Sequence, residues 1–316
     1  MTGSLHDLVA AELAEPVDAR VTAMAAALAA RYPGAARAAL FYGSCLREAQ
    51  LDGLMLDFYL IVSDYRAAFG RGWFAFANRI LPPNVFPFEH DGLAAKYAVL
   101  SEADFARLNG PGAGDVSVWA RFAQPSRLVW AADEAAREQA INAVARAVPT
   151  LFALTIPMLD GTARRDALAI FKAGFALTYG AELRAERASR PNAITDTDPI
   201  RYQRFGALAL AEYPTPRPPR RPKGYYKSGW QEGRERIRYR KAILRRWRVL
   251  RYKGKTLSLL RLAKATTTYA GGVDYLAWKI NRHAGTKIEV KPWQRRWPIL
   301  GGLILLPRLL RRGAIR

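Results

Sequence analysis

The chain has 316 residues, of which 50% are hydrophobic, so it can bury a sizeable core in two domains with an extension. A single cysteine, Cys45, excludes an intramolecular disulfide framework and a cysteine-rich zinc site, and the three histidines are scattered without ligand spacing. The formal charge of +22 calls for a polyanionic partner or surface.

Basic residues are concentrated in the last third of the chain. Residues 216–316 hold 28 Lys and Arg but only 4 Asp and Glu, a net charge of +24, whereas residues 1–215 carry a net charge of −2. The first two thirds therefore have the charge balance of an ordinary globular body. We expect the last third to meet the anionic surface.

The N-terminal segment, residues 5–31, is alanine-rich and predicted to be helical, with a break at Pro16 and an end at Pro33-Gly34. One face of this helix carries an apolar stripe of Val17, Val21, Met24 and Leu28, which predicts that the helix packs on a core. The first residues lack the charged-then-apolar pattern of a signal peptide, and their acidic residues argue against a transit peptide. We therefore expect a cytoplasmic protein.

The next segment places a Gly-Ser turn between two apolar strands. One predicted strand begins near Ala38 and runs into Gly43-Ser44, and the other ends at Val62. Glycine lets the backbone approach a phosphate closely, and a serine hydroxyl and a helix N-terminus donate to phosphate oxygens. Gly43 and Ser44 are therefore candidate nucleotide-binding residues, with an ordinary structural turn as the alternative.

The second strand carries one carboxylate, Asp57, among apolar neighbours. A charge in such a strand is costly unless it is paired or metal-bound, so we expect Asp57 to hold Mg²⁺ from a rigid element. A second acidic residue two positions away would complete the usual site, but Met55 stands there. The second ligand must come from elsewhere, and the candidates are Asp52, Glu48 and Glu89.

Ser63-Asp64 predicts the start of a helix whose aromatic side we expect in the core. That side consists of Phe69, Trp73, Phe74, Phe76 and Ile80.

Residues 84–101 predict a β-hairpin that turns at His90-Asp91-Gly92. Lys96 lies inside its second strand. A lone strand lysine is most often solvated, but beside a phosphate site it becomes a candidate triphosphate ligand and catalytic residue.

The pattern then becomes helical at residues 133–159 and 164–178, and Pro214–Pro222 is a proline-rich linker. The sequence therefore predicts an α+β chain in three parts. Residues 1–130 would form a domain with a mixed sheet and helices, residues 131–213 a mainly helical domain, and residues 214–316 the linker with a basic amphipathic region.

Two stretches characterise the basic region: an arginine-dense predicted helix at residues 233–251, and an apolar run from Trp297 to Leu306 flanked by arginines. The run is too short to span a bilayer, which needs about 20 residues. Its flanking Trp and Arg favour a segment lying in the headgroup region of an anionic membrane. Nucleic acid and a solvated tail are the alternatives. Terminal Leu, Ile and Trp do little for RNA, so we expect nucleic acid to be the less suited partner.

Five short motifs follow one another between residues 38 and 184. They are Gly43-Ser44, Leu56-Asp57-Phe58, Lys96-Tyr97 with Val99 and Ser101, Arg121-Phe122 with Gln124-Pro125, and Tyr179 with Glu182 and Arg184. In this order they resemble the mitochondrial-type phosphatidate cytidylyltransferases, peripheral CDP-diacylglycerol synthases built on a nucleotidyltransferase fold. The chain departs from the family at Cys45, where the family has glycine, and at Gln124, where it has lysine.

The resemblance implies an enzyme that binds Mg²⁺ and CTP, transfers the cytidylyl group to phosphatidate and releases pyrophosphate. By role, the implied residues are Asp57 with Asp52 or Glu89 for the metal, Gly43, Ser44 and Lys96 for the triphosphate, and Arg121 with Lys172 or Arg184 for the lipid phosphate. The high Ala and Arg content suits a bacterium with GC-rich DNA, so we expect such an enzyme on the cytoplasmic face of the inner membrane.

Two other hypotheses stay open. The chain could be a nucleotidyltransferase that acts on RNA or on a protein hydroxyl, with the basic third holding the substrate. Alternatively, it could be a non-catalytic lipid- or nucleic-acid-binding protein on a degenerate transferase fold, because the second carboxylate is missing at Met55.

Overall fold

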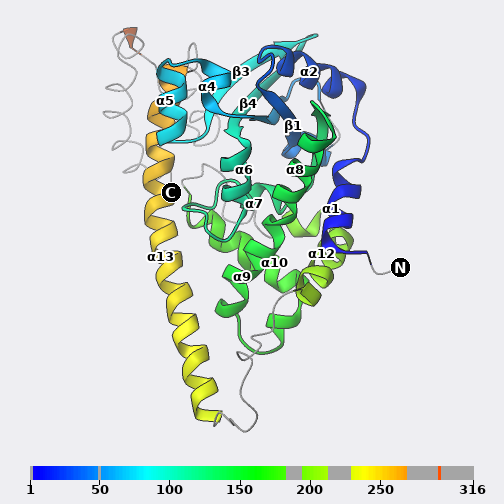
Figure 1. Cartoon of the computed structure of the whole chain (residues 1–316). Helices are drawn as coiled ribbons and strands as arrows, with labels where there is room; N and C mark the ends of the chain where they lie inside the picture. The colour runs from blue at the N-terminus through cyan, green and yellow to red at the C-terminus, as the bar shows by residue number, and fades with distance from the viewer. Residues whose placement is uncertain (1–2, 49–50, 183–193, 213–228, 269–290, 293–316) are drawn as a thin grey trace.

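The computed structural model describes residues 3–48, 51–182, 194–212, 229–268 and 291–292, without the side chains of 47–48, 229–236, 262–263 and 265–268 (Figure 1). A five-stranded sheet of order β3-β4-β2-β1-β5 forms its upper part in the view of Figure 1. The strands are β1 (Ala36–Tyr42), β2 (Met55–Val62), β3 (Asn84–His90), β4 (Leu93–Ser101) and β5 (Ser126–Ala131). Strands β2 and β4 are parallel and the other neighbours are antiparallel. The predicted α+β class is confirmed.

The helices alternate with these strands and then continue alone after β5. In the first half they are α1 (Leu5–Leu13), α2 (Ala19–Ala30), α3 (Ser44–Glu48), α4 (Tyr65–Phe69), α5 (Trp73–Ile80), α6 (Glu102–Asn109) and α7 (Trp119–Phe122). In the second half they are α8 (Glu134–Ala145), α9 (Ala147–Thr155), η1 (Ile156–Met158), η2 (Gly161–Arg165), α10 (Ala167–Tyr179), α12 (Pro199–Glu212) and α13 (Gly229–Thr268).

Several element boundaries follow from local chemistry that the sequence displays. The side chains of Asp64 and Ser101 accept hydrogen bonds from backbone N–H groups in the first turns of α4 and α6, so the predicted helix start at Asp64 is confirmed. The hairpin is also confirmed: β3 and β4 pair from Asn84↔Val99 to His90↔Leu93, around the turn at Asp91-Gly92. Strand β5 was not predicted, and it pairs with β1 at the edge of the sheet.

The sheet has two differently covered faces. Helices α2, α4 and α5 pack on one face, where Phe41, Phe58 and Val99 are buried. Helices α1, α6, α7 and α8 pack on the other face, against Leu40 and Tyr59. The side chains of β1 and β2 alternate between the two faces, as a strand with both faces covered requires.

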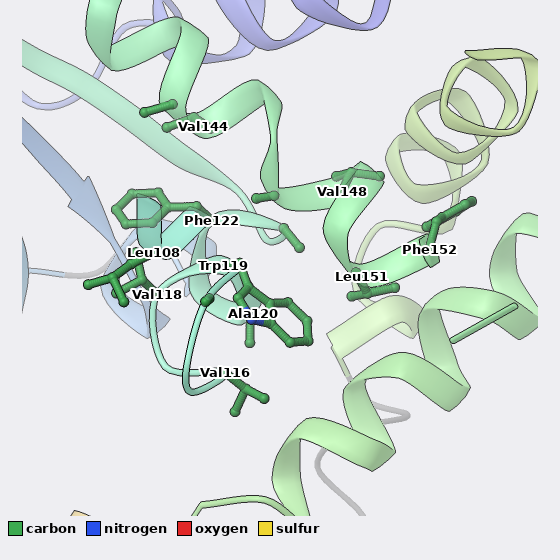
Figure 2. Packing of buried hydrophobic residues seen from close by; sticks show 14 of the residues in the cluster. Leu108, Val116, Val118, Trp119, Ala120, Phe122, Val144, Val148, Leu151 and Phe152 are labelled. Carbon is green, nitrogen blue, oxygen red and sulfur yellow. The ribbon is translucent and has the colours of Figure 1, made fainter. Parts of the chain in front are cut away.

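The core on the second face continues without interruption into the helical part of the chain. Figure 2 shows the Trp119 ring extending toward Leu151 of α9, and both residues belong to the same buried cluster as Val116 and Val118. Trp119 is fully buried, its Nε1 donates to the Asp115 carbonyl at 3.1 Å, and its ring meets that of Trp247 on α13 at 6.4 Å between centroids. Residues from all three predicted segments of the chain therefore share one core.

Helix α13 runs along one side of the molecule, from the helical part up to the sheet (Figure 1). Ile243, Trp247 and Leu250 form its buried stripe, and the Trp247 Nε1 donates to the Leu154 carbonyl at 2.9 Å. The predicted helix of the basic region is thus a packed element of the fold. The apolar run from Trp297 to Leu306 lies outside the described residues.

One expectation was wrong in part: on the aromatic side after Asp64, Phe69 packs against the core, but Trp73, Phe76 and Ile80 do not. Gly70-Arg71-Gly72 divides the predicted helix into α4 and α5, and α5 turns Ala75, Ala77 and Asn78 inward. The large side chains Trp73, Phe76 and Ile80 are exposed instead. The two glycines let the chain change direction between α4 and α5. The inward face of α5 therefore does not continue the inward face of α4, and one helical periodicity cannot predict both.

One stretch, Glu134–Met158, has the length and apolar composition of a membrane-crossing helix, and 67% of its most apolar window is buried inside the fold. It comprises α8, α9 and η1, which belong to the core described above. Its apolarity is therefore accounted for by packing within the fold.

Candidate active site

A row of paired residues crosses the sheet at the end of β1. Tyr42 of β1 pairs with Asp57 of β2, Asp57 pairs with Lys96 of β4, and Tyr42 also pairs with Ser126 of β5. Directly paired residues place their side chains on the same face of a sheet. Tyr42, Asp57 and Lys96 therefore share the face that is covered by α7.

Asp57 and Lys96 form an ion pair, with 2.8 Å between the Lys96 Nζ and the Asp57 Oδ1. The carboxylate is 17% exposed and the lysine 30%, so the pair is largely enclosed but reachable from solvent. The lysine offsets the cost of placing a carboxylate among the apolar residues of β2. The pair also leaves a cationic and an anionic group side by side at one accessible point.

The Gly-Ser turn lies directly against this pair. Gly43 has a φ of +100°, which a residue with a side chain rarely adopts, and a Cβ there would lie 2.9 Å from the Asp57 Oδ2. Ser44 then begins α3. The turn therefore presents bare backbone beside the carboxylate, and Gly43, Ser44, Asp57 and Lys96 are brought together as the sequence suggested.

Arg121 lies on α7, in the layer that covers this face of the sheet. Its Nη1 lies 3.6 Å from the Oε1 of buried Glu182 and also donates to the Ser117 carbonyl. Burial raises the pKa of the Tyr42 hydroxyl well above its usual value and Asp57 raises it further, while Arg121 acts in the opposite direction. Tyr42 is thus a neutral phenol between an anion and a cation.

A second buried network holds this layer in place. Asp115 is buried, its Oδ1 accepts from the Ser117 amide at 2.8 Å, and its Oδ2 pairs with the Arg261 Nη2 of α13 at 2.9 Å. Burial alone would raise the Asp115 pKa, but the charge and hydrogen bonds of Arg261 and the bonds from Ser117 together lower it. The Arg261 Nη1 also donates to the Ser117 Oγ at 3.2 Å, and the Ser117 carbonyl accepts from Arg121, so two contacts at Ser117 link α13 to Arg121.

Cys45, directly after the turn, is buried in the core and its thiol donates to the Met55 carbonyl at 3.4 Å. Burial raises its pKa and the Asp57 carboxylate raises it further, so the thiol stays protonated. A protonated, buried thiol is a poor nucleophile. Cys45 acts here as a small packing residue.

The remaining predicted site residues are not gathered at Asp57. Asp52 is exposed and pairs with Arg20 of α2 at 2.9 Å. Glu89 is exposed on edge strand β3, opposite Ala94, on the same face as Asp57 but one row further along. Lys172 of α10 pairs with Asp196 at 2.9 Å. Arg184 and the side chain of Glu48 lie outside the described part of the chain.

Sequence reasoning missed Tyr42, Asp115 and Arg261 as members of this site. Tyr42 could have been found from the sequence, because it directly precedes Gly43 in the same strand. In the structure it pairs with Asp57 and shares its face of the sheet. Asp115 and Arg261 could not have been found this way, since their pairing joins residues 146 positions apart. Only the packing of α13 brings them together.

The arrangement fits a Mg²⁺–phosphate complex better than a metal held by protein alone. Among the residues that the structure describes, no group of three or more His, Cys, Asp or Glu side chains gathers. Mg²⁺, however, is commonly held by one or two carboxylates together with substrate phosphates and water. Asp57 supplies one such carboxylate, on a rigid strand, beside backbone that a phosphate could approach.

No protein-family model matches the chain, and no curated protein matches it.

Proposed function

We propose that the protein is a phosphatidate cytidylyltransferase, which converts CTP and phosphatidate to CDP-diacylglycerol and pyrophosphate at a membrane surface. The observation that carries this proposal is the close approach of the Asp57 carboxylate to Gly43, where a Cβ would meet it, together with the pairing of Asp57 with Lys96. A bare turn, an acid and a lysine at one accessible point are the parts that a metal-bound nucleoside triphosphate needs. The order of the motifs that resemble this family supports the same choice.

Each residue has a role that its position allows. The Gly43-Ser44 turn would receive the triphosphate with backbone N–H groups and the serine hydroxyl. Asp57 would hold Mg²⁺, which supplies charge neutralisation when it is bound. The Lys96 ammonium, which pairs with Asp57 at 2.8 Å, would turn to the phosphate oxygens. The site thus replaces an internal ion pair with pairs to the substrate.

The reaction needs little covalent chemistry from the protein. A phosphate oxygen of phosphatidate attacks the α-phosphorus of CTP, a new P–O bond forms, and the bond to the β-phosphate oxygen breaks to release pyrophosphate. Such transfers depend on alignment and on stabilisation of developing charge. Arg121 of the covering layer would hold the lipid phosphate, and Glu182 and the Ser117 carbonyl would orient it.

One alternative has an observation in its favour. The Lys96 ammonium neutralises the Asp57 carboxylate without any ligand, and Met55 stands where a second carboxylate would be expected. A non-catalytic lipid-binding protein on a degenerate transferase fold would show the same pair. In that case Lys96 would stabilise the fold and no nucleotide would be turned over.

Transfer of the label from α-labelled CTP to phosphatidate in mixed vesicles tests the proposal. We expect Mg²⁺-dependent formation of labelled CDP-diacylglycerol with equimolar pyrophosphate, and a panel of ATP, GTP and UTP would define base selectivity. An inert protein under these conditions, with vesicle binding retained, would favour the non-catalytic alternative. Transfer to RNA or protein in place of lipid would overturn the choice of acceptor.

A further inference from the structure

Helix α5 presents an apolar surface to solvent. Trp73, Phe76 and Ile80 are 60%, 57% and 66% exposed, and they follow one another at helical spacing along one face. The rings of Trp73 and Phe76 lie 5.9 Å apart between centroids, so the surface is continuous. Phe74, 39% exposed, lies beside it.

The orientation of α5 is fixed by buried polar contacts on its other side. Asn78 is fully buried, its Nδ2 donates to the Val99 carbonyl at 2.9 Å, and its Oδ1 accepts from the Asn84 amide. The Asn84 Nδ2 in turn donates to the Phe74 carbonyl at 3.0 Å. Turning the aromatic face inward would break these bonds in a buried setting, which is costly. The outward face is therefore held in place by the fold.

The charge around α5 has one sign. No acidic residue occurs between Asp64 and Glu89, whereas Arg71 and Arg79 flank the apolar face. Asp64 itself is engaged as the cap of α4. Helix α13 ends beside α5, where Lys264 donates to the carbonyls of Leu81 and Pro83 (Figure 1). The guanidinium groups of Arg71 and Arg79 are thus the charges that flank the apolar face.

We propose that the outward face of α5 inserts into the headgroup region of an anionic membrane. A short amphipathic helix with Trp and Phe on one face and Arg at its margins is the type that lies in this interface. The inference rests on the proposed function for its lipid surface. It adds that the nucleotidyltransferase-like half of the chain touches the lipid itself, apart from the region beyond residue 268.

Fluorescent labelling of one position tests the contact in the full chain. The native thiol, Cys45, is buried, so a Phe76→Cys variant can be labelled selectively with the environment-sensitive fluorophore NBD. Ile200→Cys on α12, at a residue that is 68% exposed, is the matched control. We expect a blue shift and a roughly twofold gain in emission at position 76 on vesicles with about one third phosphatidylglycerol. The control label should not change.

A triple variant, Trp73→Ser, Phe76→Ser and Ile80→Ser, gives a second measurement. Vesicle partitioning should fall about tenfold, because three large apolar side chains no longer enter the interface. Ile200→Ser should leave partitioning unchanged. Transfer of cytidylyl to a water-soluble, short-chain phosphatidate should be retained by the triple variant, which distinguishes a lost membrane contact from a lost enzyme.

Three results would overturn the inference. An unchanged label at position 76, on vesicles that carry the protein, would place the membrane contact elsewhere and leave the proposed function intact. A label that is already blue-shifted without vesicles, and loses the shift when the chain is cut after residue 292, would show that the chain's own C-terminal segment covers α5. Unchanged partitioning of the triple variant would exclude α5 as a contributor.

Discussion

At the scale of single residues, the candidate site depends on one close approach. Gly43 combines a positive φ with a position where a side chain would meet the Asp57 carboxylate. Gly34 also has a positive φ, +71°, but nothing lies within 4 Å of the place where its Cβ would be. An alanine at Gly34 would therefore add only backbone strain, whereas an alanine at Gly43 would add backbone strain and a steric clash with Asp57.

Gly43→Ala should lower cytidylyl transfer by at least about tenfold and stability by about 1–2 kcal/mol, since it adds both strain and a clash. Gly34→Ala should cost about 1 kcal/mol of stability and leave transfer unchanged. Transfer assays and urea denaturation of both variants measure this. Equal transfer in the two variants would remove the Gly43 turn from the site.

Lys264 gives the fold a pH dependence. Burial lowers its pKa to about 7 and the nearby Arg261 contributes in the same direction, from a usual value of 10.5. The folded state therefore disfavours the protonated lysine. This cost is fully present below the folded pKa and is relieved as pH rises toward the unfolded pKa.

The free energy of unfolding should therefore contain a component that rises between about pH 7 and pH 9, and Lys264→Met should reduce that rise. Lys255→Met, at an exposed position of the same helix, should not. Urea titrations across this range are the measurement. The same pH slope in wild type and Lys264→Met would mean that Lys264 is not desolvated in solution.

At the scale of elements, α13 is more than a carrier of positive charge. Its buried stripe packs on the helical part, and Gly254 lies so close to the Ala181 carbonyl that a Cβ would collide with it. Ala181 precedes Glu182, the partner of Arg121. With Arg261 on Asp115, α13 supports both ends of the layer that faces Asp57.

Trp247→Ala should destabilise the protein by about 3–5 kcal/mol, because a fully enclosed ring leaves a cavity. Tyr252→Ala, at a residue that is 82% exposed on the same helix, should change stability by less than about 0.5 kcal/mol. Thermal and urea unfolding provide the comparison. A loss below about 1 kcal/mol at Trp247 would show that α13 is detached in solution.

The sequence predicted individual helices and strands better than the contacts between residues that are far apart in the chain. The hairpin and the helix start at Asp64 could be predicted, because each depends on neighbours in the chain. The exposure of Trp73 could not, since two glycines reset the helix phase. Nor could the pairing of Arg261 with Asp115, which no local pattern encodes.

At the scale of the whole molecule, the excess positive charge and the proposed metal and phosphate ligands lie in different parts of the chain. Asp57 and Lys96 lie in residues 1–215, which carry a net charge of −2, whereas residues 216–316, which supply the supporting Arg261, carry a net charge of +24. Basic residues near an anionic leaflet contribute roughly 1 kcal/mol each, and salt screens this attraction. Membrane binding and nucleotide binding should therefore be separable.

Removal of residues 293–316 should weaken binding to anionic vesicles by about tenfold or more, since it deletes an apolar run and several arginines. Affinity for Mg²⁺·CTP should stay within about twofold, because the Asp57 site is built from earlier residues. Flotation and calorimetry measure the two quantities. Parallel loss of both would point to misfolding of the shortened chain.

The most direct measurement of the central claim is the turnover of Asp57→Asn beside Asp91→Asn. The first change removes the charge at the Gly43 turn, whereas the second makes the same substitution in an exposed hairpin turn with a φ of +46° that asparagine tolerates. We predict that Asp57→Asn loses Mg²⁺-dependent cytidylyl transfer while it still binds vesicles, and that Asp91→Asn retains both. Retained transfer in Asp57→Asn would contradict the proposed site.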